Sequence, residues 1–193
     1  MIAIVILAAG KSSRLGSKKQ LLSWKKSTLL ETSIVAAQGT DYSPIMAIVP
    51  QDNEIINTIQ HHDIVVIPNL QREQGVSTSI KLGTQHIINN SPQTKAAIFM
   101  VCDQPFITSQ ILCELGEKYK RGCDIVTCSY GGTWGIPTLF SRKYFSEILE
   151  LSGDKGAKKL LQRHKDLCAT IEFPQGNADI DTMEDYGKYK NQD

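Results

Sequence analysis

Four cationic side chains crowd the stretch that follows the first apolar run of this sequence: Lys11, Arg14, Lys18 and Lys19. The run itself covers residues 2–7 and breaks at Ala8, Ala9 and Gly10. Small side chains at such a break leave the backbone open, so its free N–H groups can meet an anion. Cations beside exposed amides indicate a ligand with several negative charges, such as a nucleoside triphosphate.

A carboxylate ends a second apolar run. Asp103 closes residues 95–103 and is followed by Gln104 and Pro105. A carboxylate at the end of a buried strand costs free energy unless it is paired or bound to a metal. Magnesium sites in phosphoryl chemistry use one or two carboxylates together with substrate phosphates. Asp103 is therefore predicted to bind Mg²⁺, and a simple role in capping the next turn is the alternative.

Two further carboxylates lie close together near the end of the sequence. Asp179 and Asp181 alternate with Ile180, so in an extended chain they share one face. Either could supply a second metal ligand. Asp181 could instead cap a helix that begins at Thr182.

Several other functional motifs are absent. Gly10, Lys11 and Ser12 look like the end of a Walker A loop, but Val5 stands where that loop needs glycine. Gly10 and Gly16 are too far apart for a dinucleotide fingerprint. The five cysteines form no C-x-x-C pair and the four histidines lack zinc-ligand spacing, so we expect reduced thiols and no zinc site.

The elements that must position these side chains alternate between strand and helix patterns. Strands are predicted over residues 2–7, 44–49, 64–67, 95–103 and 124–128. Helices are predicted over residues 28–38 and 53–60, from within 74–79 through Gly83, and after a cap at Thr108. This alternation predicts an α/β fold, a three-layer α/β/α sandwich around a mostly parallel sheet. Ligands should gather at the carboxyl ends of its strands.

Composition limits the classes of protein to consider. The 193 residues fit one domain, residues 1–193, with 41% hydrophobic and 21% charged residues. A net charge of +1 gives no electrostatic case for nucleic acid. Apolar runs are too short for a membrane span and the start lacks a basic signal region, so a cytoplasmic protein is expected.

The first motif is specific enough to carry a resemblance. The pattern L-A-A-G-x-S-x-R-x-G-x-x-K-x-L-L is formed by Leu7, Ala8, Ala9, Gly10, Ser12, Arg14, Gly16, Lys19, Leu21 and Leu22. It resembles the signature loop of nucleotidyltransferases with the Rossmann-like nucleotide-diphospho-sugar transferase fold. The resemblance implies that this loop wraps a nucleoside triphosphate, with Arg14 and Lys19 as catalytic residues that contact its phosphates.

Two more stretches resemble motifs of the same family. Asn69, Gly75 and Ser77 form N-x5-G-x-S, which in the family contacts the nucleotide. Capping of the following helix by Ser77 and Ser79 is the alternative role. Asp103 stands in the D-x-P context where the family places a catalytic, metal-binding aspartate.

The second half of the sequence resembles one subgroup, the molybdenum cofactor cytidylyltransferases. Residues 151–161 match L-S-G-D-x-G-A-x-x-L-L, and residues 179–185 match D-I-D-T-P-E-D except that Met183 replaces proline. Residues 135–140 resemble G-H-P-x-L-F with Ile136 in place of histidine, in a segment expected to form either a shaped substrate loop or a hairpin over Trp134. By resemblance Asp181 is the second Mg²⁺ ligand, and Asp179 is the reserve candidate.

The resemblance implies a reaction. The phosphate of molybdopterin would attack CTP, accept CMP and release pyrophosphate, and a molybdenum hydroxylase could receive the product. The cytidylyl branch carries L-A-A-G where the guanylyl branch tends to carry L-A-G-G, and residues 7–10 have the former. A sugar phosphate or another phosphorylated small molecule as acceptor, GTP as donor, and a non-catalytic molybdopterin-delivery protein are the alternatives.

Overall fold

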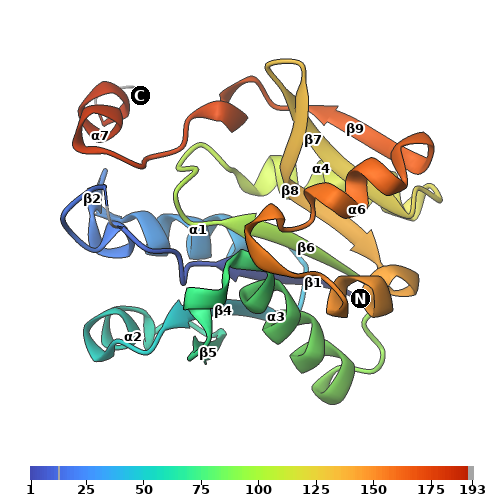
Figure 1. The fold of residues 1–193 in the computed structure, drawn as a ribbon, viewed down its shortest axis with the longest axis horizontal. Coiled ribbons are helices and arrows are strands. Elements are labelled where there is room, and N and C mark those ends of the chain that lie inside the picture. The colour runs from blue at the N-terminus through green and yellow to red at the C-terminus, as the bar shows by residue number, and fades with distance from the viewer. Residues whose placement is uncertain (13, 191–193) are drawn as a thin grey trace.

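A mixed sheet of seven strands forms the centre of the protein (Figure 1). The computed structural model describes residues 1–12 and 14–190. Across the sheet the order is β5 (Val65–Asn69), β4 (Ile45–Pro50), β1 (Ile2–Leu7), β6 (Ala96–Val101), β8 (Thr133–Ser141), β7 (Ile125–Tyr130) and β9 (Cys168–Glu172). Every residue of β1 is buried, as a continuous apolar run in the middle of a parallel sheet requires.

Strand direction decides which residues meet at the functional edge of the sheet. β5, β4, β1 and β6 are parallel neighbours, whereas β8 runs antiparallel to both β6 and β7. The carboxyl ends of β1 and β6 pair through Leu7 and Val101. Because β8 is reversed, its first residues lie at the edge where the parallel strands end. Trp134 in β8 pairs there with Ser129 of β7.

Helices cover both faces of the sheet, which confirms the three-layer α/β/α architecture. Side chains from α1 (Leu29–Gln38), α2 (Asn53–Ile59) and α4 (Ser109–Lys120) pack in the core on one face. The other face carries α3 (Val76–Asn90), α5 (Phe145–Leu149) and α6 (Lys158–Arg163). None of the helices formed by residues 1–12 and 14–190 is long and apolar enough to cross a membrane.

A third, smaller apolar cluster lies beside the sandwich. It joins the short hairpin of β2 (Ser23–Trp24) and β3 (Ser27–Thr28) to α7 (Met183–Tyr189), as the left of Figure 1 shows. Trp24 and Ile180 are fully buried in it, and the Tyr186 hydroxyl donates a hydrogen bond to the Ser23 carbonyl at 2.6 Å. The carboxyl-terminal segment is thereby anchored against the amino-terminal part of the chain.

The structure decides several alternatives that the sequence left open. Residues 125–141 form the β7–β8 hairpin rather than a shaped loop, with Trp134 half-buried against the core. Thr108 caps α4 as predicted. Gly75 rather than a serine occupies the N-cap of α3, and no side chain caps that helix. Thr182 caps α7 within a capping box, which leaves Asp181 free of that role.

Candidate active site

Four residues predicted from separate motifs meet in one ion-pair cluster. The Lys19 ammonium lies 2.8 Å from Asp103 Oδ2 and 2.8 Å from Asp181 Oδ1. Arg14 Nη2 lies 2.7 Å from the other oxygen of Asp181. The cluster therefore joins the loop after β1, the end of β6 and the segment before α7. We refer to Arg14, Lys19, Asp103 and Asp181 as the charged cluster.

Local hydrogen bonds hold Lys19 in place. The residues after β1 turn back on themselves, and a short 3₁₀ helix, Lys19–Leu21, brings Gln20 over the end of the strand. Gln20 Nε2 donates to the Ala8 carbonyl at 2.6 Å and to the Gly10 carbonyl at 3.3 Å. The backbone N–H of Lys19 donates to Ser12 Oγ at 2.9 Å. These contacts fix the loop so that the Lys19 side chain, only 7% exposed, points at the two carboxylates.

The two acidic segments are tied directly to each other. The backbone N–H of Ile180 donates to the Asp103 carbonyl at 2.9 Å. Gln104 Nε2 donates to the Gly176 carbonyl at 2.8 Å and to Asp179 Oδ1 at 2.9 Å. Asp179 and Asp181 thus flank a residue that hydrogen bonds to the end of β6, while the Ile180 side chain packs in the third apolar cluster.

The cluster shifts the ionisation of its members. Burial alone would lower the pKa of the Lys19 ammonium, but the charges and hydrogen bonds of Asp103 and Asp181 outweigh it and raise that pKa. The hydrogen bond from Lys19, together with the charges of Lys19 and Arg14, lowers the pKa of Asp181. Partial burial and the neighbouring carboxylates raise the pKa of Asp179. At neutral pH the cluster holds charged groups of both signs.

The donor set of this cluster fits a magnesium ion. The side chains of Asp103 and Asp181 are 23% and 36% exposed, so they reach the cavity while the ammonium of Lys19 lies behind them. Asp103 Oδ2 and Asp181 Oδ1 already share one cationic group, the Lys19 ammonium, at 2.8 Å each. Carboxylate oxygens are the protein ligands that Mg²⁺ prefers, with water and phosphate oxygens completing its shell.

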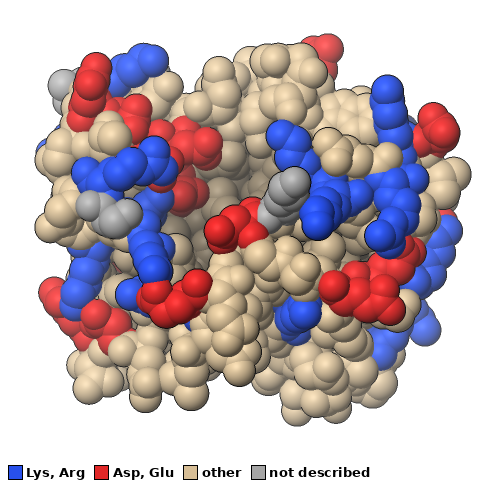
Figure 2. Space-filling view, in the orientation of Figure 1, with Lys and Arg blue, Asp and Glu red and all other residues tan. Residues whose placement is uncertain are grey.

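Two cavities meet at Asp103 of the charged cluster, and Arg14 and Lys19 line neither of them. The first, of about 340 Å³, is lined by the loop after β1 and the start of α3, including Leu7, Ala9, Gly10, Gly75 and Ser79. The second, of about 440 Å³, is lined by residues of β8, among them Trp134 and Ile136, and by Asp179 and Asp181. Asp103, Asp154, Val76 and Val101 line both. Figure 2 shows acidic side chains in the hollow of this face, with basic side chains on either side.

The first cavity offers a helix amino terminus to an anion. α3 is 15 residues long and starts at Val76 without a side-chain cap, so free N–H groups of its first turn remain available. Lys11 lines the same cavity and forms an ion pair with Glu73. Cations and helix amides therefore surround a space bounded by the small residues at the end of β1.

Position 75 requires glycine, because the segment around Asp154 packs closely against it. Its φ of +100° lies in the left-handed region. A Cβ atom there would lie 2.5 Å from Asp154 Oδ1 and 2.6 Å from the Gly153 backbone carbon. The segment around residue 154 thus packs directly on the start of α3. Neither Ser152 nor Asp154 caps α6, whose N-cap is Ala157.

Not every predicted nucleotide-binding residue faces a cavity. Asn69 is buried, donating to Thr78 Oγ1 and Ser79 Oγ at 2.9 Å each and accepting from the Gln71 N–H at 2.8 Å. It therefore holds β5 against the first turn of α3. Ser77 and Ala8 are also buried and line neither of the two cavities described above. Ser12 lines another cavity, together with Gly16 and Lys18.

The structure adds two residues that the sequence did not single out for the site, Gln104 and Tyr130, which line the second cavity. Ser79, which the sequence offered as a helix cap, does not cap α3 and lines the first cavity. Gln104 directly follows Asp103, and that adjacency was the one available signal. Nothing in the sequence pairs Tyr130 with this site, because its position depends on the β7–β8 hairpin.

Comparison with known proteins agrees with this geometry. The MobA-like NTP transferase domain family matches residues 4–167. The chain is 26% identical over 186 residues to the molybdenum cofactor cytidylyltransferase of Escherichia coli, covering 96% of this chain and 93% of that protein. It is 25% identical over 197 residues to the purine catabolism protein PucB of Bacillus subtilis, covering 94% and 92%.

A solved structure agrees as well. Rv0371c of Mycobacterium tuberculosis superposes with a TM-score of 0.82 at 26% identity, covering 99% of this chain and 97% of that one. The family match, the shared fold and the convergence of the motifs at one edge of the sheet lead to one conclusion. The chain belongs to the MobA-like NTP transferase domain family and is a nucleotidyltransferase.

Proposed function

We propose that this nucleotidyltransferase transfers CMP from CTP to the phosphate of a molybdopterin-type acceptor and releases pyrophosphate, with Mg²⁺ as its metal ion. The observation that carries the proposal is the pair of cavities that share Asp103 as a wall, with Lys19 in contact with that carboxylate. An enzyme that joins two substrates needs both held side by side, with their reacting atoms near each other.

The reaction needs little proton chemistry. An oxygen of the acceptor phosphate attacks the α-phosphorus of CTP and forms a new phosphoanhydride bond. The bond from the α-phosphorus to the bridging oxygen of the β-phosphate breaks, and its electron pair leaves with pyrophosphate. Because the acceptor phosphate is already anionic near neutral pH, no general base is required. The chemistry then depends on positioning and on neutralising charge.

In the proposal the charged cluster supplies both the positioning and the neutralisation of charge. In the proposal Arg14 and Lys19 balance the negative charge of the triphosphate, which enters through the cavity beside the start of α3. Asp103 and Asp181 would hold Mg²⁺, whose contribution when bound is to draw charge from the phosphate oxygens and hold them in line. Gln104 and the hydrogen bond from Ile180 keep the acidic segments in place.

The choice of CTP and molybdopterin rests on sequence likeness. Leu7, Ala8, Ala9 and Gly10 carry the pattern of the cytidylyl branch. The E. coli relative is a molybdenum cofactor cytidylyltransferase and matches nearly the full length of this chain. If the product is a dinucleotide cofactor, a molybdenum hydroxylase is the class of enzyme that would take it up.

One observation favours a different acceptor. Ile136, which replaces the histidine of the subgroup, lines the second cavity, where the acceptor would lie. An apolar side chain there removes a donor that could contact the acceptor. The PucB relative, at nearly equal identity, carries a name from purine catabolism. Another phosphorylated small molecule, such as a sugar phosphate, is therefore the second candidate, with CTP or GTP as donor.

Pyrophosphate release tests the proposal. The protein is incubated with Mg²⁺, each of the four nucleoside triphosphates and either molybdopterin or a sugar phosphate as acceptor, and pyrophosphate is measured with time. We expect the fastest release with CTP. Release only with a sugar phosphate would establish the second candidate, and binding of nucleotide without release for any acceptor would establish a delivery protein.

A matched pair of variants identifies the site. Asp103→Asn removes a carboxylate from the charged cluster and is expected to lower turnover by about 100-fold or more, with cooperative unfolding retained. Asp41→Asn makes the same change at an exposed position and should leave turnover unchanged. Equal activity of the two variants would contradict the assignment of Asp103.

A further inference from the structure

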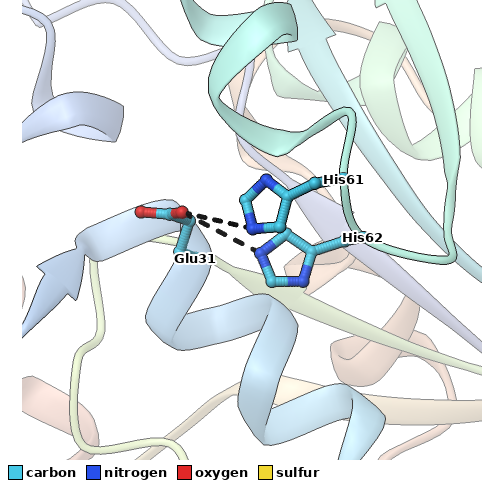
Figure 3. Close-up of side chains that lie close together, drawn as sticks. All are labelled: Glu31, His61 and His62. Atoms are coloured by element: carbon cyan, nitrogen blue, oxygen red, sulfur yellow. Dashed lines mark ion pairs between the residues drawn. The ribbon is translucent and has the colours of Figure 1, made fainter.

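A second cluster of ligand atoms lies away from both cavities. Glu31 is in the first turn of α1, and His61 and His62 lie in the turn that follows α2 (Figure 3). Nε2 of His61 is 3.8 Å and Nε2 of His62 is 4.0 Å from Oε1 of Glu31. All three ligand atoms lie within 4.8 Å of one another. Two imidazoles therefore point at one carboxylate oxygen.

The two oxygens of Glu31 have separate tasks. Oε2 accepts hydrogen bonds from the Thr28 N–H at 3.1 Å, the Thr28 hydroxyl at 2.9 Å and the Ser27 hydroxyl at 2.9 Å. These bonds form the capping box of α1 and fix the orientation of the carboxylate. Oε1 takes no part in the cap and is held toward the histidines.

A hydrogen bond to Gln38 determines which ring nitrogen of His62 carries the proton. Nδ1 of His62 lies 3.1 Å from Oε1 of Gln38. Since a carboxamide oxygen only accepts, Nδ1 must carry the proton of this bond. In the neutral ring Nε2 is then unprotonated and carries a free lone pair. This buried atom has no hydrogen-bond partner. Burial and the nearby His61 keep the pKa of His62 below its usual value, against the opposing charge of Glu31.

The lone pair of His62 Nε2 therefore faces Oε1 of Glu31 at 4.0 Å and has no hydrogen-bond donor. Buried acceptors without a partner are uncommon in folded proteins and call for a missing water or ion. A cation placed between Oε1 of Glu31 and the two imidazoles would satisfy all three atoms at once. Histidines that bind a metal through one ring nitrogen usually donate a hydrogen bond from the other, as His62 does to Gln38.

We propose that Glu31, His61 and His62 bind a divalent transition-metal ion, Zn²⁺ foremost, through Oε1 and the two Nε2 atoms. Imidazole and carboxylate together suit Zn²⁺ and its neighbours, whereas Mg²⁺ prefers oxygen ligands alone. A tetrahedral zinc ion with bonds of about 2.0–2.1 Å separates its ligand atoms by about 3.4 Å. The observed separations of 3.8 and 4.0 Å need only a small inward movement.

The side chain of His61 has room to move inward. The side chain of His61 is 62% exposed, while those of His62 and Glu31 are 12% and 16% exposed. His61 can therefore close onto an ion that the other two already face, and water can complete the shell. The ion would link the start of α1 to the turn before β5. Sequence spacing did not indicate this site, because its carboxylate comes from another helix.

Zinc titration of tag-free protein in excess Mg²⁺ tests the site, because Mg²⁺ competes for carboxylates but not for imidazoles. Calorimetry counts the bound zinc, and ¹⁵N NMR of the histidine side chains shows which rings bind. We expect one zinc ion per chain and shifts at Nε2 of His61 and His62. His86 and His164, which lie outside the cluster, should not shift.

Three variants make the test specific. Glu31→Gln and His61→Asn should each weaken zinc binding by at least about tenfold. His86→Asn, in α3, should leave it unchanged. Glutamine can still serve in a capping box, and its amide can donate to the lone pair of His62, so Glu31→Gln should keep the fold.

Two results would overturn the proposal. One is equal zinc affinity in the parent protein and Glu31→Gln. The other is the absence of zinc-dependent shifts at His61 and His62, which would leave the cluster as ordinary ion pairs. Neither result depends on the transfer reaction, so the outcome is separate from that of the proposed function.

Discussion

A single ammonium lies between two carboxylates at the centre of the site. Lys19 contacts Asp103 and Asp181 equally closely, and Arg14 holds the second oxygen of Asp181. A buried amine is costly unless it is paired in this way. In the proposed function, triphosphate and Mg²⁺ would offer each of these groups a new partner of the correct sign. In the proposed reaction, substrate binding therefore exchanges partners within the cluster and introduces no unpaired charge.

The pH dependence of stability should report on Asp181. Its pKa is lowered in the folded state, first by the hydrogen bond from Lys19, so its carboxylate stabilises the fold above its unfolded pKa of about 3.9. That stabilisation is lost as the pH falls through the lower, folded value. The free energy of unfolding of the parent protein should therefore exceed that of Asp181→Asn most near neutral pH.

Urea unfolding of both proteins from pH 7 down to about pH 3 measures this difference. We expect the two curves to approach each other below about pH 4. A difference that stays constant, or that grows toward acid pH, would show that the contact of Asp181 with Lys19 does not stabilise the folded state.

At the residue scale, sequence patterns predicted the charged residues better than the polar ones. Arg14, Lys19, Asp103 and Asp181 were predicted from three motifs, and all four meet in one cluster. Their charges at fixed spacing within motifs made these four residues recognisable, although only Lys19 among them is buried. Asn69 satisfies its hydrogen bonds inside the protein, and a motif alone cannot distinguish such a role from ligand contact.

At the scale of elements, the start of α3 and the segment before α6 depend on each other. Gly75 allows the backbone around Gly153 to lie against the helix amino terminus, where a Cβ atom would be within 2.6 Å of a backbone carbon. This contact brings Asp154 to the wall that both cavities share. Two motifs far apart in the sequence thus form one surface.

Gly75→Ala should therefore disturb both the start of α3 and the segment before α6. The left-handed φ and the contact with Gly153 together predict a loss of about 1–3 kcal/mol in the free energy of unfolding. Gly187→Ala, in α7 with no atom near the added methyl group, should be neutral or stabilising by up to about 1 kcal/mol. Denaturant unfolding of both variants measures the contrast, and equal stabilities would contradict the argument.

The strands and helices of the first two thirds of the chain mostly followed from local pattern, whereas β8, β9 and α5 were not predicted. Continuous apolar runs indicated β1 and β6, helical apolar spacing indicated α1 and a capping threonine indicated α4, because these features depend on neighbours in the sequence. The glycines and Trp134 between residues 130 and 140 suggested a loop as readily as a hairpin. Pairing of β8 with both β6 and β7 decided between them, and such long-range pairing has no local signature.

For the whole molecule, the arrangement of strands divides the site into two halves. The parallel strands place the loop after β1 and the start of α3 around one cavity. The reversed strand β8 brings Trp134 and Ile136 to the other. Asp103, at the end of the strand between them, belongs to both. The proposed function assigns the first cavity to the nucleotide and the second to the acceptor.

Steady-state kinetics can separate the two halves. Trp134→Ala removes a large aromatic surface from the second cavity and should raise the KM for the acceptor by about tenfold or more, with the KM for CTP unchanged. Lys11→Ala removes a cation from the first cavity and should raise the KM for CTP alone. Each variant is the control for the other, and a shared change in both constants would contradict the division.

The segment that carries Asp181 is held in place separately from the main core. The position of Asp181 depends on its neighbour Ile180, whose backbone N–H donates to the Asp103 carbonyl and whose side chain packs in a small apolar cluster outside the main core. Cleavage or rearrangement near residue 175 would leave the seven-stranded sheet and the first cavity intact while removing one of the two acidic groups at the border. Under the proposed function, such a protein would still bind a nucleotide but would not transfer it, so binding and turnover would be separable.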